Sequence, residues 1–109
     1  GLYPAGFVPK LRIDILDAIK GMVEVPLVLH GGSSNPDSEI AAAVEHGINK
    51  VNISSDIKAP FYKKCREVLQ NQGLREPNAI YPPCIEVLRE VVAQKIHLFN
   101  ADGKAALYR

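Results

Sequence analysis

The residues best suited to chemistry follow two short hydrophobic segments. Residues 25–30 read Val-Pro-Leu-Val-Leu-His, and Gly-Gly-Ser-Ser follows at residues 31–34. Glycines let an anion approach the backbone, serine hydroxyls donate hydrogen bonds, and the N-terminus of a following helix carries roughly half a positive elementary charge. This pattern favours a phosphate-binding loop beside His30. The alternative is a simple turn with Ser34 or Asp37 as a helix cap.

A second polar segment, Asn-Ile-Ser-Ser-Asp at residues 52–56, offers amide, hydroxyl and carboxylate groups. It follows the first by roughly 20 residues, the length of one strand-helix unit. In parallel α/β folds, ligands bind at the carboxyl ends of the strands, so neighbouring strands bring their polar ends to one edge. Two such segments favour a binding site over two unrelated turns.

His30 directly follows a hydrophobic segment, where an imidazole can bind zinc through one ring nitrogen while another group holds the second. A catalytic zinc usually takes three protein ligands plus water or substrate, and no second His or Cys stands at ligand spacing from His30. His46 lies at the C-terminal end of one predicted helix and His97 within another, and both are expected to be surface or packing residues. Any further metal ligands are therefore expected outside this sequence.

Alternating helices and strands are expected to position these residues. The predicted segments are helix 12–20, strand 25–30, helix 38–45, strand 51–55, helix 56–70 and helix 85–99. Gly21 and Gly47 are expected to end the first two helices, residues 71–83 to form a loop, and the first strand to be buried on both faces. The alternation indicates a parallel sheet, either in an α/β layer protein or in a (β/α)8 barrel.

Composition excludes several classes of protein. The 109 residues carry 13 basic and 12 acidic side chains, a net charge of +1, without the basic run that nucleic-acid binding needs. No stretch approaches the roughly 18 apolar residues of a membrane span. Cys65 and Cys84 form no metal or disulfide motif, so we expect packing residues in a reduced, cytoplasmic protein. The absence of an initiating Met suggests a fragment.

The two polar segments resemble those of the class II fructose- and tagatose-bisphosphate aldolases. The matching residues are Leu-Val-Leu-His-Gly-Gly-Ser-Ser at 27–34 and Lys-Val-Asn-Ile-Ser-Ser-Asp at 50–56, and residues 1–11 and 91–105 agree as well. This family is a (β/α)8 barrel. The resemblance therefore implies an α/β fold in which residues 1–109 form the C-terminal portion of a single TIM-barrel domain, the last two or three βα units and a C-terminal helix. The N-terminal half would be absent.

The resemblance also implies a role for individual residues. His30 matches a zinc ligand, Gly31 to Ser33 match the loop that holds the phosphate of dihydroxyacetone phosphate, and Asn52 matches a contact to the ketose. Gly1 matches the glycine directly after another zinc-binding histidine. The implied substrate-binding residues are Gly1, Gly31, Gly32, Ser33, Asn52, Ile53, Ser54 and Ser55. The family's catalytic aspartate would lie in the absent half, so no catalytic residue is assigned in this chain.

The implied activity is reversible, zinc-dependent aldol cleavage of a phosphorylated ketose to dihydroxyacetone phosphate and an aldehyde, as in glycolysis. A homodimer or homotetramer is expected, with this chain inactive by itself. Three residues differ from the pattern of the resembling family. Ser34 stands where many members have glycine, Ser54 where fructose-bisphosphate members often have aspartate, and Asn78 where many members have arginine. A non-catalytic sugar-phosphate-binding module and a purely structural half-barrel are the alternatives.

Overall fold

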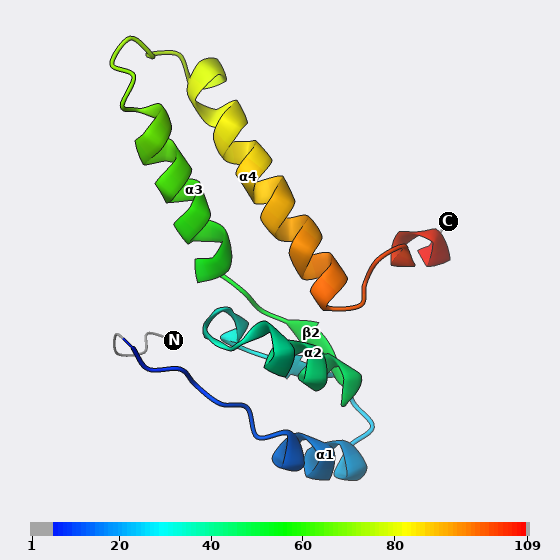
Figure 1. Ribbon diagram of the computed structural model, residues 1–109. Helices are drawn as coiled ribbons and strands as arrows, with labels where there is room; N and C mark the ends of the chain where they lie inside the picture. Colours follow the sequence, from blue (N-terminus) through cyan, green and yellow to red (C-terminus); the bar gives the residue numbers. More distant parts are fainter. Residues whose placement is uncertain (1–5, 109) are drawn as a thin grey trace. The chain divides into compact units, whose positions relative to one another are not determined.

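The computed structural model describes residues 6–108, which form two compact units (Figure 1). Among the described residues, the first unit contains 6–53 and 96–108, and the second contains 54–95. The elements within the described residues are α1 (Ile13–Met22), β1 (Leu27–Leu29), α2 (Asp37–Glu45), β2 (Ile48–Val51), α3 (Ser55–Val68) and α4 (Pro77–Leu98), with short 3-10 helices at Gly32–Ser34 and Lys104–Tyr108. No helix among residues 6–108 is long and apolar enough to cross a membrane.

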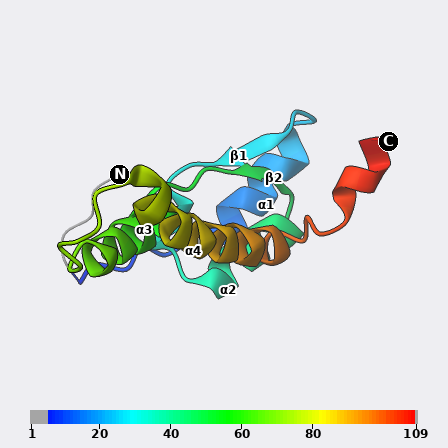
Figure 2. The ribbon, with the colours of Figure 1, turned by 90° about the horizontal axis from the view of Figure 1, so that it is seen from above.

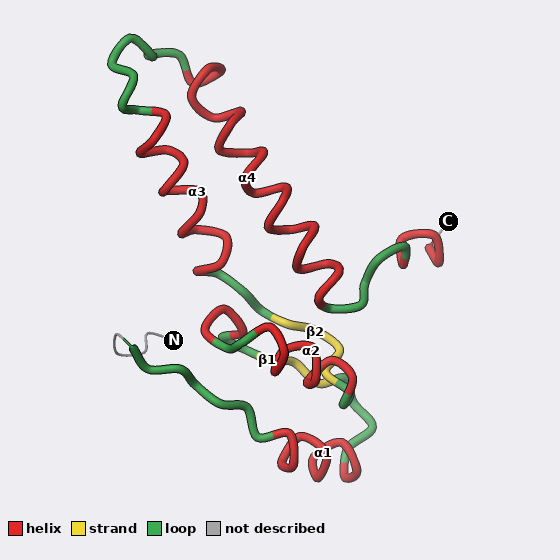
Figure 3. The backbone as a smooth tube through the Cα atoms, viewed as in Figure 1, coloured by secondary structure: helices red, strands yellow, loops and turns green. Residues whose placement is uncertain are grey.

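The first unit is a strand-helix-strand arrangement with parallel strands (Figure 3). β1 pairs with β2 so that Leu27 lies opposite Ile48 and Leu29 opposite Val51. Because parallel strands need a crossover between them, the intervening α2 returns the chain to the same end of the sheet. The predicted parallel pair with a connecting helix is therefore confirmed.

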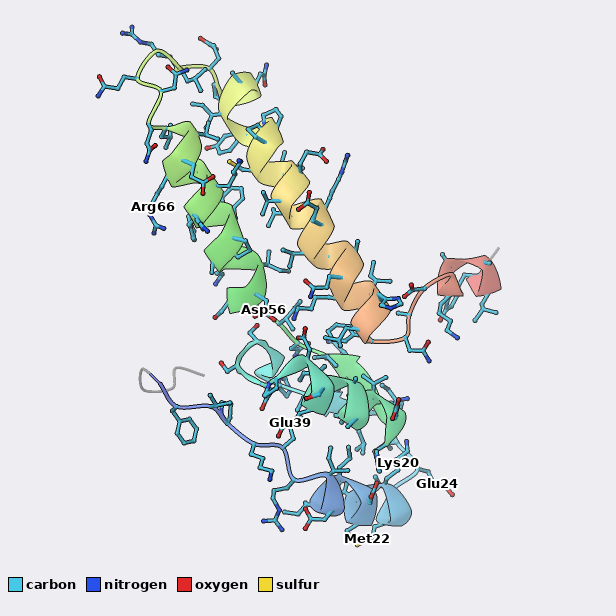
Figure 4. All side chains as sticks on the ribbon, viewed as in Figure 1. Lys20, Met22, Glu24, Glu39, Asp56 and Arg66 are labelled. Atoms are coloured by element: carbon cyan, nitrogen blue, oxygen red, sulfur yellow. The ribbon has the colours of Figure 1, made fainter. Side chains whose placement is uncertain are left out.

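The small core of this unit lies on α2. Ile40 and Ala43 are 1% and 2% exposed, and the neighbouring α1 packs against α2. Glu39, labelled in Figure 4, joins the segment before α1 to α2, because its carboxylate accepts a hydrogen bond from the backbone N–H of Leu11 at 2.9 Å. Successive strand residues point to opposite faces, and Val28 is 43% exposed. The prediction that this strand is buried on both faces is wrong for the described residues.

Three predicted boundaries are also wrong. β2 ends at Val51 instead of beginning there, because the polar pair Asn49-Lys50 belongs to the strand. The side-chain carbonyl oxygen of Asn49 accepts a hydrogen bond from Leu27 N–H at 3.0 Å. Gly21 lies inside α1, which continues to Met22. α4 begins at Pro77, inside the predicted loop, since proline is favourable in the first turn of a helix.

The second unit is a helical hairpin in which α3 and α4 run antiparallel and side by side, as both views show (Figures 1 and 2). Cys84 on α4 is fully buried, and the Sγ atoms of Cys65 and Cys84 lie 3.3 Å apart. At the start of α3, the Asp56 carboxylate lies 2.6 Å from the Lys95 ammonium group of α4. A thiol contact, and an ion pair near the open end of the hairpin, therefore join the two helices.

The Asp56–Lys95 ion pair is expected to stabilise this hairpin. Its side chains are only 24% and 12% exposed, so Asp56→Asn removes a negative charge 2.6 Å from a poorly hydrated ammonium group. We expect a loss of about 1–3 kcal/mol in the free energy of unfolding, between the values for exposed and buried pairs. Chemical denaturation of the complete protein measures it.

The exposed pair Arg12–Asp14 provides the control. The guanidinium hydrogen bond from Arg12 lowers the pKa of Asp14 to about 2, but both side chains are about two-thirds exposed and water screens their interaction. Asp14→Asn is therefore expected to change the unfolding midpoint little. Equal effects of Asp56→Asn and Asp14→Asn would contradict a stabilising role for the pair on the hairpin.

Candidate functional site

The main chain ties together the segments that follow the two parallel strands. The N–H of Asn52 donates to the carbonyl oxygen of Leu29 at 2.9 Å, and the N–H of Gly32 donates to the carbonyl oxygen of Asn52 at 3.0 Å. These two bonds extend the pairing beyond Leu29 and Val51, the last residues of β1 and β2. Residues that were predicted to meet at one sheet edge are therefore adjacent in the structure.

The side chains of His30 and Asn52 meet directly at this edge. Asn52 Nδ2 lies 3.0 Å from His30 Nδ1, and the His30 residue is exposed. Which group donates depends on the ring tautomer and on which way the amide faces. With the amide oxygen toward the ring, Nδ1–H donates to it and Nε2 keeps a lone pair. The imidazole is thus held on one side by Asn52 and open to solvent on another, as a histidine that binds a ligand must be.

The loop after His30 approaches the neighbouring segment closely. Gly31 has φ +68°, a left-handed conformation that favours glycine. Gly32 is buried, and a Cβ atom there would lie 2.8 Å from Val51 Cγ1 and 3.4 Å from the carbonyl oxygen of Asn52. Ser33 lies in the short 3-10 helix that follows. The backbone conformation therefore favours glycine at position 31 and the packing against Val51 favours it at position 32, whether or not an anion binds.

Two residues that the sequence analysis did not assign also shape this loop. Val51 supplies the methyl group that excludes a side chain at Gly32. Asn35 closes the loop, because its Nδ2 atom donates to the carbonyl oxygen of Gly31 at 3.5 Å. The signal for Asn35 was the Asn-Pro pair at residues 35–36, since asparagine side chains commonly hydrogen-bond to nearby backbone in turns.

The remaining predicted site residues are placed as follows. Ile53 is the last residue of the first unit before the hairpin, Ser54 occupies the N-cap position of α3 without a side-chain cap hydrogen bond, and Ser55 is the first residue of α3. The carbonyl oxygen of Ser54 accepts hydrogen bonds from the N–H groups of Ile57 and Lys58, each at 3.1 Å. Gly1 lies outside the described residues. The two serines therefore stand at a helix N-terminus, where the helix dipole suits an anion.

The described residues hold no complete metal site, since no three of their His, Cys, Asp and Glu side chains cluster. His30 is a suitable single ligand because it is exposed and its orientation is fixed by Asn52. The other two histidines lie elsewhere: His46 Nδ1 is 2.7 Å from Asp17, and His97 Nδ1 is 3.0 Å from Asp102, with all four side chains at least 42% exposed. They are surface residues, as expected.

Comparisons with known proteins place the chain among the aldolases. The family model described as "Fructose-bisphosphate aldolase class-II" matches residues 1–104. The chain is 36% identical to a D-tagatose-1,6-bisphosphate aldolase subunit of Klebsiella oxytoca, over 95% of this chain and 36% of that protein. It is also 36% identical to the 6-phospho-5-dehydro-2-deoxy-D-gluconate aldolase of Bacillus subtilis, over 90% of this chain and 34% of that protein. The chain thus spans about a third of the length of these relatives.

A crystal structure of the YdjI aldolase from Escherichia coli K12 is similar to the model, with a TM-score of 0.74 and 32% sequence identity. The match covers 89% of this chain and 36% of the aldolase. It confirms the predicted fold class, an α/β fold that forms part of a (β/α)8 barrel.

Proposed function

The chain belongs to the class-II fructose-bisphosphate aldolase family, and on that premise we propose that it supplies part of the active site of a zinc-dependent aldolase. The complete protein would cleave a phosphorylated ketose reversibly to dihydroxyacetone phosphate and an aldehyde. His30 would be one zinc ligand, and Asn52 a substrate contact. The other metal ligands and the catalytic aspartate would belong to the remainder of the barrel.

The observation that carries this proposal is the contact between the His30 and Asn52 side chains at 3.0 Å. An amide within hydrogen-bond distance of one ring nitrogen orients the imidazole, and metal-binding histidines generally have such a partner. The same amide lies at the strand ends, where ligands bind in (β/α)8 barrels. A simple turn after β1 does not require these two side chains to meet.

The loop from Gly31 to Ser33 is the proposed phosphate site. At Gly31 no side chain separates an anion from the backbone, the buried Gly32 holds the loop against Val51 and Asn52, and Ser33 brings a hydroxyl group to the same loop. Ser54 and Ser55 would complete phosphate binding from the N-terminus of α3, with Ile53 and Gly1 as further substrate contacts. The dipoles of the main chain would then stabilise the negative charge of the phosphate.

A bound zinc ion would act as a Lewis acid that polarises the ketose carbonyl and stabilises the negative charge that develops on cleavage. His30 would contribute one lone pair to hold it. Asn52 would keep the His30 ring in one orientation and hydrogen-bond to the ketose, while the Gly31–Ser33 loop holds the phosphate. The residues of this chain therefore bind and orient the substrate, and none of them is assigned the proton transfer.

The substrate class follows from the relatives and from one departure. Tagatose 1,6-bisphosphate, named for the Klebsiella oxytoca relative, carries two phosphates. The 6-phospho-5-dehydro-2-deoxy-D-gluconate named for the Bacillus subtilis relative carries one. Asn78 stands where an arginine is common in the resembling bisphosphate aldolases. A neutral amide binds a second phosphate less strongly than a guanidinium group does. We therefore propose a ketose with one phosphate as the second candidate, and comparing kcat/KM for the two substrate types distinguishes them.

The remainder of the barrel is the first partner that this proposal requires. We also propose a cytoplasmic homodimer or homotetramer, as in the resembling enzymes. Mass spectrometry of the native complete protein, with metal analysis, tests the chain composition, the subunit number and the zinc content together. A zinc-free protein that binds dihydroxyacetone phosphate without cleaving any ketose would instead be a binding module, and one that binds no ligand would be a structural part.

Asn52→Ala in the complete protein is expected to lower kcat by roughly 10–100-fold, because the change removes both the His30 contact and the substrate contact. Circular dichroism should show an unchanged fold, since the backbone bonds of Asn52 remain. Asn49→Ala is the matched control. It removes the hydrogen bond to Leu27 N–H, which should cost about 1 kcal/mol of stability and leave kcat unchanged. Normal kinetics for Asn52→Ala would remove Asn52 from the site.

A further inference from the structure

We infer that Cys65 and Cys84 form an oxidation site, at which a hydroperoxide converts the two thiols to an intrachain disulfide between α3 and α4. The Sγ atoms lie 3.3 Å apart on facing helices of one hairpin, and both cysteines are free thiols. A disulfide bond is about 2.0 Å long, so the sulfurs must approach by only about 1 Å. The proposal does not depend on the aldolase activity, because neither cysteine belongs to the proposed site.

The two sulfurs are not equivalent, which sets the order of the reaction. Cys84 is fully buried, and its thiol donates to the carbonyl oxygen of Ile80 at 3.3 Å. Burial, followed by the hydrogen bond with Cys65, raises the pKa of the Cys84 thiol. Cys65 is only partly buried, so its sulfur is the more accessible of the two. The oxidant therefore reaches Cys65 first, and Cys84 is the resolving thiol.

The two thiols are oxidised to the disulfide in two steps. The Cys65 thiolate attacks one oxygen of the hydroperoxide, the O–O bond breaks, and Cys65 becomes a sulfenic acid while water or an alcohol leaves. The sulfur of Cys84 then attacks the Cys65 sulfur, the S–O bond breaks, and the departing hydroxide takes the Cys84 proton to leave as water. The two thiols lose two electrons and the peroxide gains them. A dithiol reductant reverses the change.

The test is peptide mapping of the folded, full-length protein after treatment with hydrogen peroxide and blocking of the remaining thiols. A Glu-specific protease places Cys65 in peptide 46–67 and Cys84 in peptide 68–86, because the bond between Glu76 and Pro77 resists cleavage. We expect these two peptides to appear linked, two hydrogen atoms lighter than their sum, in most of the protein. Dithiothreitol should separate them.

Two variants control the assignment. Cys65→Ser should leave Cys84 reduced at the same peroxide dose, and Cys84→Ala should leave Cys65 as a sulfenic acid that a dimedone probe labels. Three results in the wild-type protein would overturn the proposal: both thiols unmodified, Cys65 carried to the sulfinic acid while Cys84 stays reduced, or a link from either cysteine to another chain or another cysteine.

Discussion

His30→Ala is expected to abolish zinc-dependent cleavage in the complete protein and to lower its zinc content. Loss of one of three protein ligands weakens the metal site, and without the metal the Lewis acid is lost. We expect kcat/KM to fall by at least roughly 10³-fold, since a metal supplies several kcal/mol of transition-state stabilisation. Steady-state kinetics and metal analysis of the same sample measure both effects.

His97→Ala is the matched control for this experiment. Its imidazole is 85% exposed and lies beside Asp102 near the end of α4, outside the proposed site. Zinc content and kcat/KM should both stay at the wild-type values. If His30→Ala retained a normal zinc content and rate, His30 would not be a ligand.

Gly32→Ala is the change with the largest expected effect on the fold around the site. The new methyl group would lie 2.8 Å from Val51 Cγ1 and 3.4 Å from the carbonyl oxygen of Asn52. Forcing a methyl group into packed surroundings typically costs about 1–3 kcal/mol. The same shift would lengthen the bond from Gly32 N–H to Asn52 and displace the phosphate loop. Chemical denaturation and the KM for the ketose phosphate should both report the change.

Gly21→Ala is a control that is expected to raise the free energy of unfolding instead of lowering it. Gly21 is an exposed residue within α1, and a Cβ atom there meets no other group within 4 Å among the described residues. Replacing a glycine by alanine inside a helix stabilises it by roughly 0.5–1 kcal/mol. An unchanged stability and KM for Gly32→Ala would mean that the loop tolerates a side chain and does not approach Asn52 closely in solution.

The contact between His30 and Asn52 was predictable in outline because it follows from strand order. Each residue comes just after an apolar segment, and parallel strands place such residues at the same edge. The atomic pairing through Nδ1 and Nδ2 was not predictable, since it depends on the register between Leu29 and Val51. Neither was the position of β2, whose polar Asn49 and Lys50 lack the alternation of a typical strand.

The hairpin was less predictable than the strand pair. Pro82 and Pro83 indicated a loop, because proline removes a backbone donor and usually interrupts a helix, yet α4 continues through both. The contact between Cys65 and Cys84 joins residues 19 positions apart on different helices, and no local pattern encodes such a pairing. The fold class and the proximity of His30 to Asn52 were therefore accessible from the sequence, whereas element boundaries and atomic side-chain contacts required the structure.

The most direct test of the aldolase proposal is the release of dihydroxyacetone phosphate by the complete protein, measured before and after removal of metal with a chelator. Fructose 1,6-bisphosphate, tagatose 1,6-bisphosphate and 6-phospho-5-dehydro-2-deoxy-D-gluconate should be assayed in parallel. We predict release from at least one of them, its loss on chelation and its return when zinc is added. Release that survives complete metal removal, or no release from any of the three, would contradict a zinc-dependent aldolase of this substrate class.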